Sequence, residues 1–565
     1  MSHLLRKWVT AGLSAGVLAG AGCQDEQNQQ RPSVAVVASG EPVYNTVGKL
    51  MPPDAAPLDQ QSYRFLVIEP STLDANIAIY QAQSGIFPFE GLGRLNHNFE
   101  LVPAAAERWE SNDAGDKWTF YLRKDGKWSD GRPVTAQDFE YTFKRAIDPA
   151  SANVYAFFYY PIKGAKAFNQ GKTKNRDSVG VTAIDEHTLV IETEGPCPYL
   201  PQLTAFTGSG AVPQWQVEKY GPKWTEPENC VTNSSFMVDS WDHGRQMEYV
   251  LNPHYNGSFK AYLERVTAIF IGAETDAGHL PYEEGEVDYQ VVTSREVPAL
   301  RGNPELRDQL HIYSTFRTRF LIFDDQKKPY SDLRVRQAIS HAVDREVLAN
   351  VVMQGTASAA YSMLPPGFPG DAGSSLDNIQ RFDPEMGRQL LAEAGYPGGR
   401  GFPKKEMVLR GTEMKQEAQA IQQMLKDNLN IDLPIKILEA KAYSTALMQW
   451  EMPLSLGGFS QDFPDAHNML SMVWRSQPKP FGRQPWKNGE FDRLVDSAAV
   501  EMDHEKRMGM YADAQKILAE DVGAVFLFYQ KEASLRKPWL KGIKENSIGE
   551  YPFRNYMDMY IGQGR

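Results

Sequence analysis

The first half of the chain carries the alternation of apolar and polar residues that is typical of β-strands. Over residues 117–124, Trp118, Phe120 and Leu122 fall on one face of an extended chain, and polar or amphipathic residues fall on the other. A second run of this kind, over residues 63–69, stands at the start of this strand-rich half. The pattern predicts antiparallel sheet in this half.

From about residue 313 onward the apolar residues recur at the spacing of amphipathic helices. One predicted helix has Ser331 or Asp332 as its N-cap. The next has Asp383 as its N-cap, proline in its first turn, and ends at Gly395. Helices followed directly by strands imply α/β layers. Two such successions are predicted: a helix over 418–429 into a strand over 431–437, and a helix over 504–520 into a strand over 524–529.

The N-terminus has the pattern of an export signal. A basic start precedes an uncharged run from Trp8 to Ala21, which is too short for a confident membrane span. The run ends at Cys23, and the pattern resembles a bacterial lipoprotein signal in which residues 1–22 are removed and Cys23 is lipidated. Gly20 stands where such signals usually carry Leu. An ordinary secretory signal with an unrelated cysteine is the alternative.

Length and charge narrow the choice of architecture and partner. A chain of 565 residues is too long for one core, so we expect two or three lobes after a flexible linker over residues 23–61. The net charge of -12 argues against a nucleic acid or an anionic membrane surface as the partner. Cys197 and Cys230 either form a disulfide in an oxidising envelope or remain as buried free thiols.

Segments spread from Glu69 to Asp465 carry a shared pattern through their order along the chain, rather than through any single one. They include 69–74 (EPSTLD), 101–110 (LVPAAAERWE), 118–123 (WTFYLR), 128–139 (WSDGRPVTAQDF), 228–236 (ENCVTNSSF), 334–344 (RVRQAISHAVD) and 458–465 (GFSQDFPD). Together they resemble one family, the oligopeptide- and dipeptide-binding proteins of bacterial ABC importers, which are family 5 extracellular solute-binding proteins. The segment over 128–139 is close to the signature of this family.

The resemblance implies an α/β, periplasmic binding protein-like fold of type II. Such a fold has two lobes and three domains, and a hinged cleft lies between the lobes. Strands of both lobes would pair with an extended peptide when the cleft closes. The expected limits are 62–95, 205–312 and 525–565 for lobe I, 96–204 for a small extra subdomain of lobe I, and 313–524 for lobe II.

The same resemblance suggests which residues bind the ligand. Asp462 matches the family's aspartate for the peptide ammonium, a charge-assisted contact that does not depend on the peptide's side chains. Gly458, Phe459 and Ser460 would line the same strand, and Tyr155 matches a pocket tyrosine of the smaller jaw. A surface turn capped by the aspartate is the competing interpretation.

Three positions depart from the family pattern. Leu447 and Leu456 stand where members that take longer peptides carry arginines for the C-terminal carboxylate, and Ala440 replaces a common large aromatic residue. Arg317 and Arg319, on a strand at the lobe junction, are either a replacement positive charge or solvated strand residues. We include Arg319 among the expected ligand-binding residues.

No pattern in the sequence favours catalysis. Residues 12–16 match a nucleophile-elbow expression but lie inside the predicted signal, and the ten histidines show no metal-ligand spacing. Together with the export pattern, the resemblance implies a monomeric, non-enzymatic binding protein of the periplasm or cell envelope that needs no cofactor or metal. It would be held to the membrane only by the Cys23 lipid and would deliver short peptides to ABC permease subunits. A non-peptide solute (a metal chelate, an oligosaccharide or an opine-like compound) and, less favoured, an envelope hydrolase are the alternatives.

Overall fold

The computed structural model describes residues 42–83, 85–272, 278–479, 482–544 and 556–565. Residues from Val43 to Arg565 form one compact unit, while the predicted signal and Cys23 lie outside the described residues. The predicted linker is too long at its C-terminal end. Val47, Met51 and Ala56 are buried, and the Ala56 backbone N–H donates to the carbonyl of Ile561, because these apolar residues complete a core.

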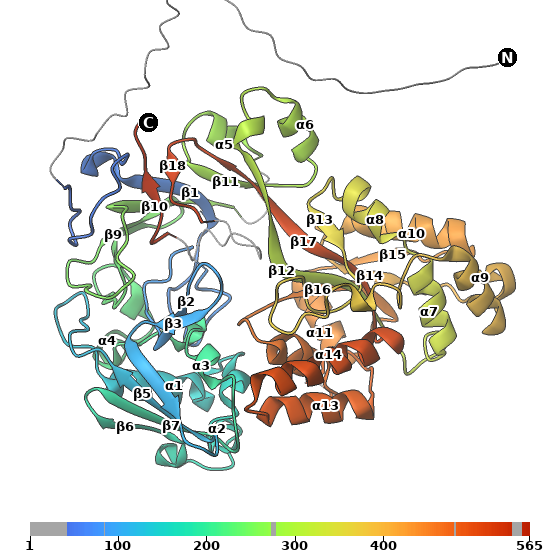
Figure 1. Ribbon diagram of the computed structural model, residues 1–565, viewed down its shortest axis with the longest axis horizontal. Helices are drawn as coiled ribbons and strands as arrows, with labels where there is room; N and C mark the ends of the chain where they lie inside the picture. The colour runs from blue at the N-terminus through green and yellow to red at the C-terminus, as the bar shows by residue number, and fades with distance from the viewer. Residues whose placement is uncertain (1–41, 84, 273–277, 480–481, 545–555) are drawn as a thin grey trace, which may run out of the picture. The chain divides into compact units, whose positions relative to one another are not determined.

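Eleven of the described strands form one mixed sheet (Figure 1). Ten of them are hydrogen-bonded in sequence across it, and the eleventh, β13 (Ala357–Ala359), pairs with β17. The order is β15 (Ile435–Leu438), β14 (Met407–Arg410), β16 (Leu454–Ser460), β12 (Leu310–Phe323), β17 (Ala524–Arg536), β11 (Tyr289–Val292), β1 (Ser62–Ile68), β10 (Arg265–Ile271), β9 (Gln246–Leu251) and β8 (Phe236–Asp242).

Two long antiparallel strands, β12 and β17, run side by side through the middle of this sheet (Figure 1). Their first contact pairs Leu310–Ser314 with residues 531–535, and the second pairs Thr318–Ile322 with residues 524–529. A bulge separates the two stretches, and bulges bend a strand and increase its twist. One stretch continues into β11 and β1 and the other into β16 and β14, so the strand pair connects the two halves of the sheet.

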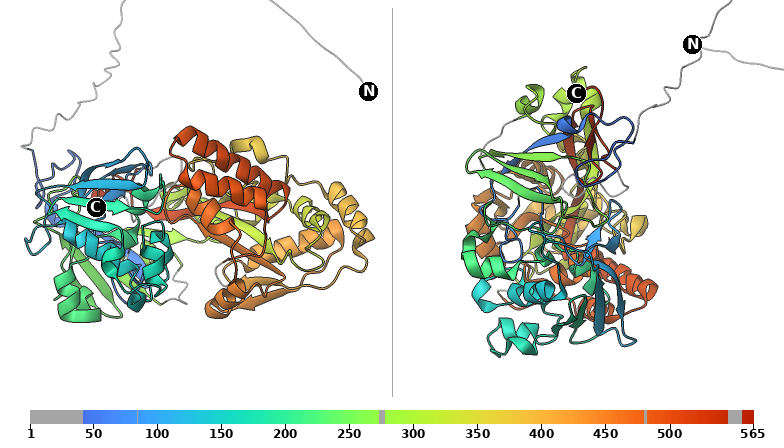
Figure 2. Two further views of the ribbon diagram at one scale, coloured as in Figure 1. Left: turned by 90° about the horizontal axis from the view of Figure 1, so that it is seen from below. Right: turned by 90° about the vertical axis from the view of Figure 1, so that its left-hand side faces the viewer.

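Helices cover both faces of the sheet in the second half of the chain. Leu321 and Val525 point into one core together with α7 (Leu333–His341), α9 (Pro384–Glu393) and α10 (Lys415–Leu429). Their neighbours Phe320 and Phe526 point into another core with α13 (Gly489–Val500) and α14 (His504–Glu520), which lie side by side in Figures 1 and 2. Adjacent strand residues face opposite sides, so each strand contributes to both cores. The predicted α/β layering is confirmed here.

A separate antiparallel sheet confirms the prediction for residues 117–124. Its order is β4 (Ala106–Ser111), β5 (Lys117–Leu122), β7 (Thr188–Glu192) and β6 (Val181–Asp185). Trp118, Phe120 and Leu122 are buried against α1 (Ala136–Ala146), whose first turn is held by a hydrogen bond from the Thr135 backbone N–H to the Asp138 carboxylate. This core also contains Trp128, which is fully buried.

The remaining described elements are short and complete the two halves. The strands β2 and β3 pair with each other, as do β18 and β19. The bounds are β2 (Gly93–Leu95), β3 (Leu101–Pro103), α2 (Ala165–Asn169), α3 (Leu200–Leu203), α4 (Gln214–Tyr220), α5 (Leu280–Glu283), α6 (Val297–Gly302), α8 (Arg345–Val347), α11 (Ala440–Gln449), α12 (Met472–Trp474), β18 (Leu540–Lys541) and β19 (Tyr560–Ile561).

Two predicted elements differ from the observed ones. The strand expected over 431–437 is shorter, because Ile431 and Leu433 are buried in the core before β15 begins at Ile435. The strand expected over 524–529 continues to Arg536, because its second part pairs with β11 and with the start of β12. The predicted lobe and subdomain limits stay a prediction, since the contacts group residues 43–565 as one unit.

The two cysteines after the predicted signal are free thiols, so the disulfide interpretation is wrong in this structure. Cys197 is buried in the core of the β4–β5–β7–β6 sheet, whereas Cys230 packs against the core beneath β8 and β9. Because the two side chains belong to different cores, they do not meet. Burial raises the pKa of both thiols to about 12. The described helices include none with the length and apolar character needed to span a bilayer.

Candidate ligand-binding site

The six residues expected to bind ligand line one cavity of about 680 Å³. Tyr155 lies on one side of it. On the other side are Arg319 on β12 and the run that forms the end of β16 and the residues after it. Thr315 on β12 comes from the bulged region between the two paired stretches, and Glu532 on β17 comes from the end of the first stretch, where it pairs with Tyr313. The cavity therefore adjoins the strand pair that connects the two halves of the sheet.

Asp462 lies two residues after the end of β16 and faces this cavity rather than an isolated surface turn. Its backbone N–H donates to Asn468 Oδ1 at 2.8 Å, and Asn468 Nδ2 donates to Asp462 Oδ2 at 3.1 Å. The hydroxyl of Tyr155 donates to Asp462 Oδ1 at 3.1 Å. These hydrogen bonds orient the carboxylate within the cavity lining.

Tyr155 precedes a short 3₁₀ turn and is fixed by aromatic neighbours. Its ring stacks on that of Phe206 with centroids 5.5 Å apart, and its hydroxyl lies 3.0 Å from the hydroxyl of Tyr80. Burial, followed by the negative charge of Asp462, raises the pKa of Tyr155 well above its usual value. The phenol therefore stays protonated and acts as a donor to the carboxylate.

A buried ion pair fixes the segment that carries Asp462. Arg507 on α14 donates through Nη1 to Asp465 Oδ2 at 2.7 Å and through Nη2 to Asp465 Oδ1 at 2.5 Å, and both side chains are only 4% exposed. The next turn includes His467, whose ring stacks on that of Tyr199 with centroids 4.0 Å apart. Burial lowers the pKa of His467 to about 4, so the imidazole is neutral at pH 7. The sequence analysis gave no role to this ion pair.

The predicted strand residues fit a main-chain binding surface. The residues of β12 pair with the whole of β16, but β14 pairs with it only at Leu454 and Ser455. Among the described strands, none pairs with the other edge of β16 from Leu456 to Ser460, so that edge is available to an added strand. Gly458 is required at this point, because a Cβ there would lie 2.7 Å from Arg319 Cδ and 2.8 Å from the carbonyl oxygen of Thr318.

Arg319 is held in place across Gly458. Its Nε donates to Gln530 Oε1 at 3.0 Å, and its Nη2 donates to Glu413 Oε1 at 3.1 Å. Burial, and then the like charge of Arg317, lowers the pKa of Arg319 below its usual value, while Glu413 opposes this shift. Arg319 is a paired, mostly buried charge, so the interpretation as a solvated strand residue is wrong for this side chain.

Several cavity residues had no counterpart in the sequence analysis. Gln461 is 6% exposed, and neither its Oε1 nor its Nε2 has a hydrogen-bond partner among the residues that the structure describes. An unpaired buried amide is costly, which points to a partner supplied by ligand or solvent. No local pattern marks these residues, because they come from separate elements. They are Tyr80, Arg410, Glu413, Gln461, Arg483 and Glu532.

The three positions that depart from the family pattern lie outside this cavity lining. Leu456 is 2% exposed in the core below the sheet, and Leu447 packs with Tyr443 and Met452. Ala440 begins α11 and is exposed. The positive charge in the cavity comes instead from Arg317, Arg319, Arg410 and Arg483.

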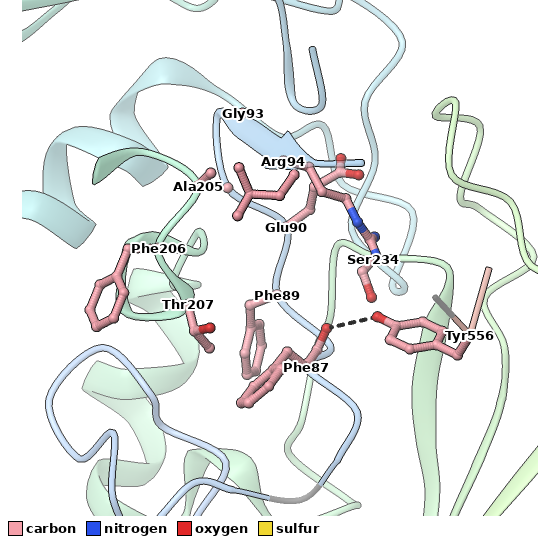
Figure 3. A pocket seen from close by; sticks show the side chains of 12 residues that line it. Phe87, Phe89, Glu90, Gly93, Arg94, Ala205, Phe206, Thr207, Ser234 and Tyr556 are labelled. Carbon is pink, nitrogen blue, oxygen red and sulfur yellow. Dashed lines mark hydrogen bonds between the residues drawn. The ribbon is translucent and has the colours of Figure 1, made fainter. Parts of the chain in front are cut away.

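A second, smaller cavity of about 80 Å³ lies beside the first and shares Phe87, Phe206 and Thr207 with it (Figure 3). Figure 3 shows Glu90 and Arg94 near one end of this cavity and the phenylalanines near the other. The Tyr556 hydroxyl donates to the carbonyl of Phe87 at 3.5 Å. Burial raises the pKa of Glu90, although Arg123 opposes the shift. Across the described residues, no group of three or more histidines, cysteines or carboxylates is arranged to hold a metal ion.

The cavity lies beside the pair of strands that connects the two halves of the sheet. It is lined by an oriented carboxylate, by arginines and by a strand edge that no described strand pairs with. These features define a binding protein for a solute that has positive and negative groups and a main chain. The chain belongs to the bacterial extracellular solute-binding proteins of family 5, whose model matches residues 100–481. The predicted family and the predicted two-lobed α/β fold class are thereby confirmed. The members of this family bind solutes and are not enzymes.

Relatives of known structure or known name support the same placement. The chain is 29% identical over 499 residues to the probable deoxycholate-binding periplasmic protein YgiS of Escherichia coli. This alignment covers 87% of this chain and 91% of YgiS. It is 30% identical over 487 residues to the periplasmic oligopeptide-binding protein OppA of the same species. This alignment covers 84% of this chain and 87% of OppA. The structure of the E. coli murein tripeptide binding protein MppA matches with a TM-score of 0.74 and 29% identity, over 89% of this chain and 98% of MppA.

Proposed function

We propose that this protein captures short peptides in the 680 Å³ cavity and delivers them to the permease of an ABC transporter, without chemical conversion of the peptide. The observation that carries the proposal is the position of Asp462, whose carboxylate faces this cavity and accepts a hydrogen bond from Tyr155 across it. Family membership and the names of relatives such as OppA support the choice of ligand.

In this proposal the peptide's ammonium group pairs with Asp462. The main chain of the peptide pairs with the edge of β16 that β14 leaves unpaired. The buried amide of Gln461 forms a hydrogen bond with a main-chain group of the peptide nearby. These contacts are common to all peptides, so they give affinity without selecting a side chain. Residues from both sides of the cavity contact the peptide, so binding favours the closed cleft.

Asp462→Asn tests the assignment because it keeps the size of the side chain but removes its charge and one of its two acceptor oxygens. A charge-assisted contact contributes about 1.5–3 kcal/mol, so a free-amino peptide library should bind roughly tenfold to a hundredfold more weakly. Calorimetric titration measures this. Asp308→Asn, at a carboxylate that is 85% exposed and outside the cavity, is the matched control. Unchanged affinity in Asp462→Asn would reject the assigned role.

Native mass spectrometry of the protein purified from its own envelope tests the ligand class. We expect a co-purified mixture of peptides of similar length. A single non-peptide solute, together with no binding to a peptide library, would select the alternative ligand class instead. Released products from a peptide or glycan would contradict the absence of chemical conversion.

The location of the protein is proposed from its sequence and its family. Export and lipid attachment at Cys23 would place it in the periplasm or cell envelope as a monomer bound to the membrane through that lipid alone. Cys23→Ser should move the protein from the membrane fraction to the soluble fraction. Retention of the variant in the membrane fraction would contradict the anchor.

A further inference from the structure

Four arginines line the ligand cavity, and they come from separate segments of the chain. Arg317 and Arg319 lie on β12, Arg410 ends β14, and Arg483 follows α12 in the loop before α13. The protein as a whole carries a net charge of -12, so this concentration of positive charge does not follow from composition.

Three of these guanidinium groups form no ion pair with any residue that the structure describes. Arg319 pairs with Glu413 at 3.1 Å, but Arg317, Arg410 and Arg483 make no ion pair within the part of the chain that the structure describes. Arg483 lies over the ring of Phe459, 5.1 Å from its centroid, which orients the side chain without neutralising it. Arg317 and Arg483 are partly buried, where an unpaired charge is costly.

The three carboxylates among the described residues of the cavity form no ion pair with Arg317, Arg410 or Arg483. Glu413 is paired with Arg319, Asp462 is bonded to Tyr155, and Glu532 accepts a hydrogen bond from the Tyr313 hydroxyl at 2.6 Å. Burial raises the pKa of Glu532, although the hydrogen bond from Tyr313 and the positive charge of Arg317 oppose the shift. Among the described lining residues, four arginines therefore stand against three carboxylates.

The register of the strands spreads these charges along β16 at increasing distance from Asp462. Arg317 is opposite Ser460 and Arg319 is opposite Gly458. If the parallel register is continued past its last pair, Val408 with Ser455, it would bring Arg410 level with Gly457. At roughly 3.3 Å per residue, Gly457 is about 16 Å along the strand from Asp462. A peptide of three or four residues, extended from Asp462 along β16, spans about 10–13 Å and ends within reach of these arginines.

We propose that the cavity selects acidic peptides of three or four residues, with at least two carboxylates toward the end remote from the amino terminus, which Arg317, Arg410 and Arg483 bind. This inference rests on the proposed function and specifies its ligand class. The C-terminal carboxylate satisfies one guanidinium, and an acidic side chain is needed to satisfy the next.

Two tripeptides of matched shape test the preference: alanyl-glutamyl-glutamate and alanyl-glutaminyl-glutamine. Both have the ammonium for Asp462, and they differ only in side-chain charge. We expect the acidic peptide to bind at least about tenfold more tightly in low salt, since charge-assisted hydrogen bonds contribute more than neutral ones. The difference should shrink as ionic strength rises.

The arginine variants then assign the preference to the site. Arg317→Gln, Arg410→Gln and Arg483→Gln should each reduce the ratio of the two affinities, and the loss of the guanidinium that holds the C-terminal carboxylate should weaken the neutral peptide as well. Arg400→Gln, at an exposed arginine outside the cavity, is the control and should leave the ratio unchanged. The unfolding midpoint of each variant shows whether its fold is intact.

The outcomes separate this inference from the proposed function. Equal binding of the two tripeptides, or a preference that persists in all three arginine variants, would overturn the acidic selectivity while peptide capture stands. Failure of both tripeptides and of a mixed peptide library to bind would overturn the proposed function and this inference with it. A ratio that falls in the three variants and not in Arg400→Gln supports the inference.

Discussion

The hydroxyl of Tyr155 donates a hydrogen bond to the carboxylate of Asp462 at 3.1 Å, although the two residues are 307 positions apart in the chain. Tyr155 belongs to the predicted small subdomain and Asp462 to the predicted lobe II. The bond thus links the two sides of the cavity at the point where we propose that the ligand's ammonium group binds. It orients the acid without neutralising it.

Tyr155→Phe should weaken peptide binding less than Asp462→Asn does. The phenylalanine keeps the ring contacts with Phe206 but removes the donor, and a neutral hydrogen bond contributes about 0.5–1.5 kcal/mol. We therefore expect a loss of affinity of about twofold to tenfold in calorimetric titration. A loss as large as that of Asp462→Asn would mean that the hydroxyl does more than orient the carboxylate.

Gly458→Ala should destabilise the protein and disturb Arg319. The added Cβ would lie 2.8 Å from a backbone oxygen and 2.7 Å from Arg319 Cδ, so main chain or side chain must shift. Overpacking of this kind costs about 1–3 kcal/mol, measured by denaturant unfolding. The neighbouring Gly457→Ala is the control, because its Cβ meets only the Tyr443 hydroxyl at 3.2 Å. Equal effects of the two changes would contradict the role of the close approach.

Asp465→Ala should be strongly destabilising, because it leaves Arg507 buried without its anion. Breaking a buried pair from one side costs about 3–5 kcal/mol. The exposed pair of Arg475 and Asp496 provides the comparison, since Asp496→Ala should cost less than about 1 kcal/mol. Chemical denaturation of both variants measures the difference. If Asp465→Ala unfolds like the wild type, the ion pair does not hold the Asp462 segment.

The stability of the protein should fall between pH 6.5 and pH 4 because of His467. Burial lowers its pKa in the folded state to about 4, from about 6.5 in the unfolded chain. In this window the unfolded state binds the extra proton, so the stabilisation is complete above pH 6.5 and decreases as the pH falls toward 4. The difference amounts to about 3 kcal/mol.

His467→Gln isolates this contribution from the carboxylates that titrate over the same range. The free energy of unfolding of the variant, measured against pH, should have a shallower slope between pH 4 and pH 6.5 than that of the wild type. The control region is pH 7 to pH 8, where the two slopes should agree. Parallel curves across the acid range would show that His467 does not titrate as proposed.

Local signals predicted much of the α-helical framework. The helix expected over residues 504–520 is α14 with those bounds, because Asp503 caps it through a hydrogen bond to the Lys506 backbone N–H. The helix after Asp383 likewise begins at its predicted cap. Caps and apolar spacing act over a few residues, so they can be interpreted from one sequence. The length of β17 was not predicted, since it depends on pairing with β11 and β12.

The sequence by itself determined the family, through motifs spread along the chain, and it indicated Asp462, Tyr155 and the end of β16 as site residues. Only the tertiary structure decided that these residues share one cavity, that Cys197 and Cys230 belong to different cores, and that Arg410, Arg483 and Gln461 join the site. The reason is physical. A cap or an amphipathic face depends on neighbours along the chain, whereas the charge balance of a cavity depends on segments that meet only when distant strands pair.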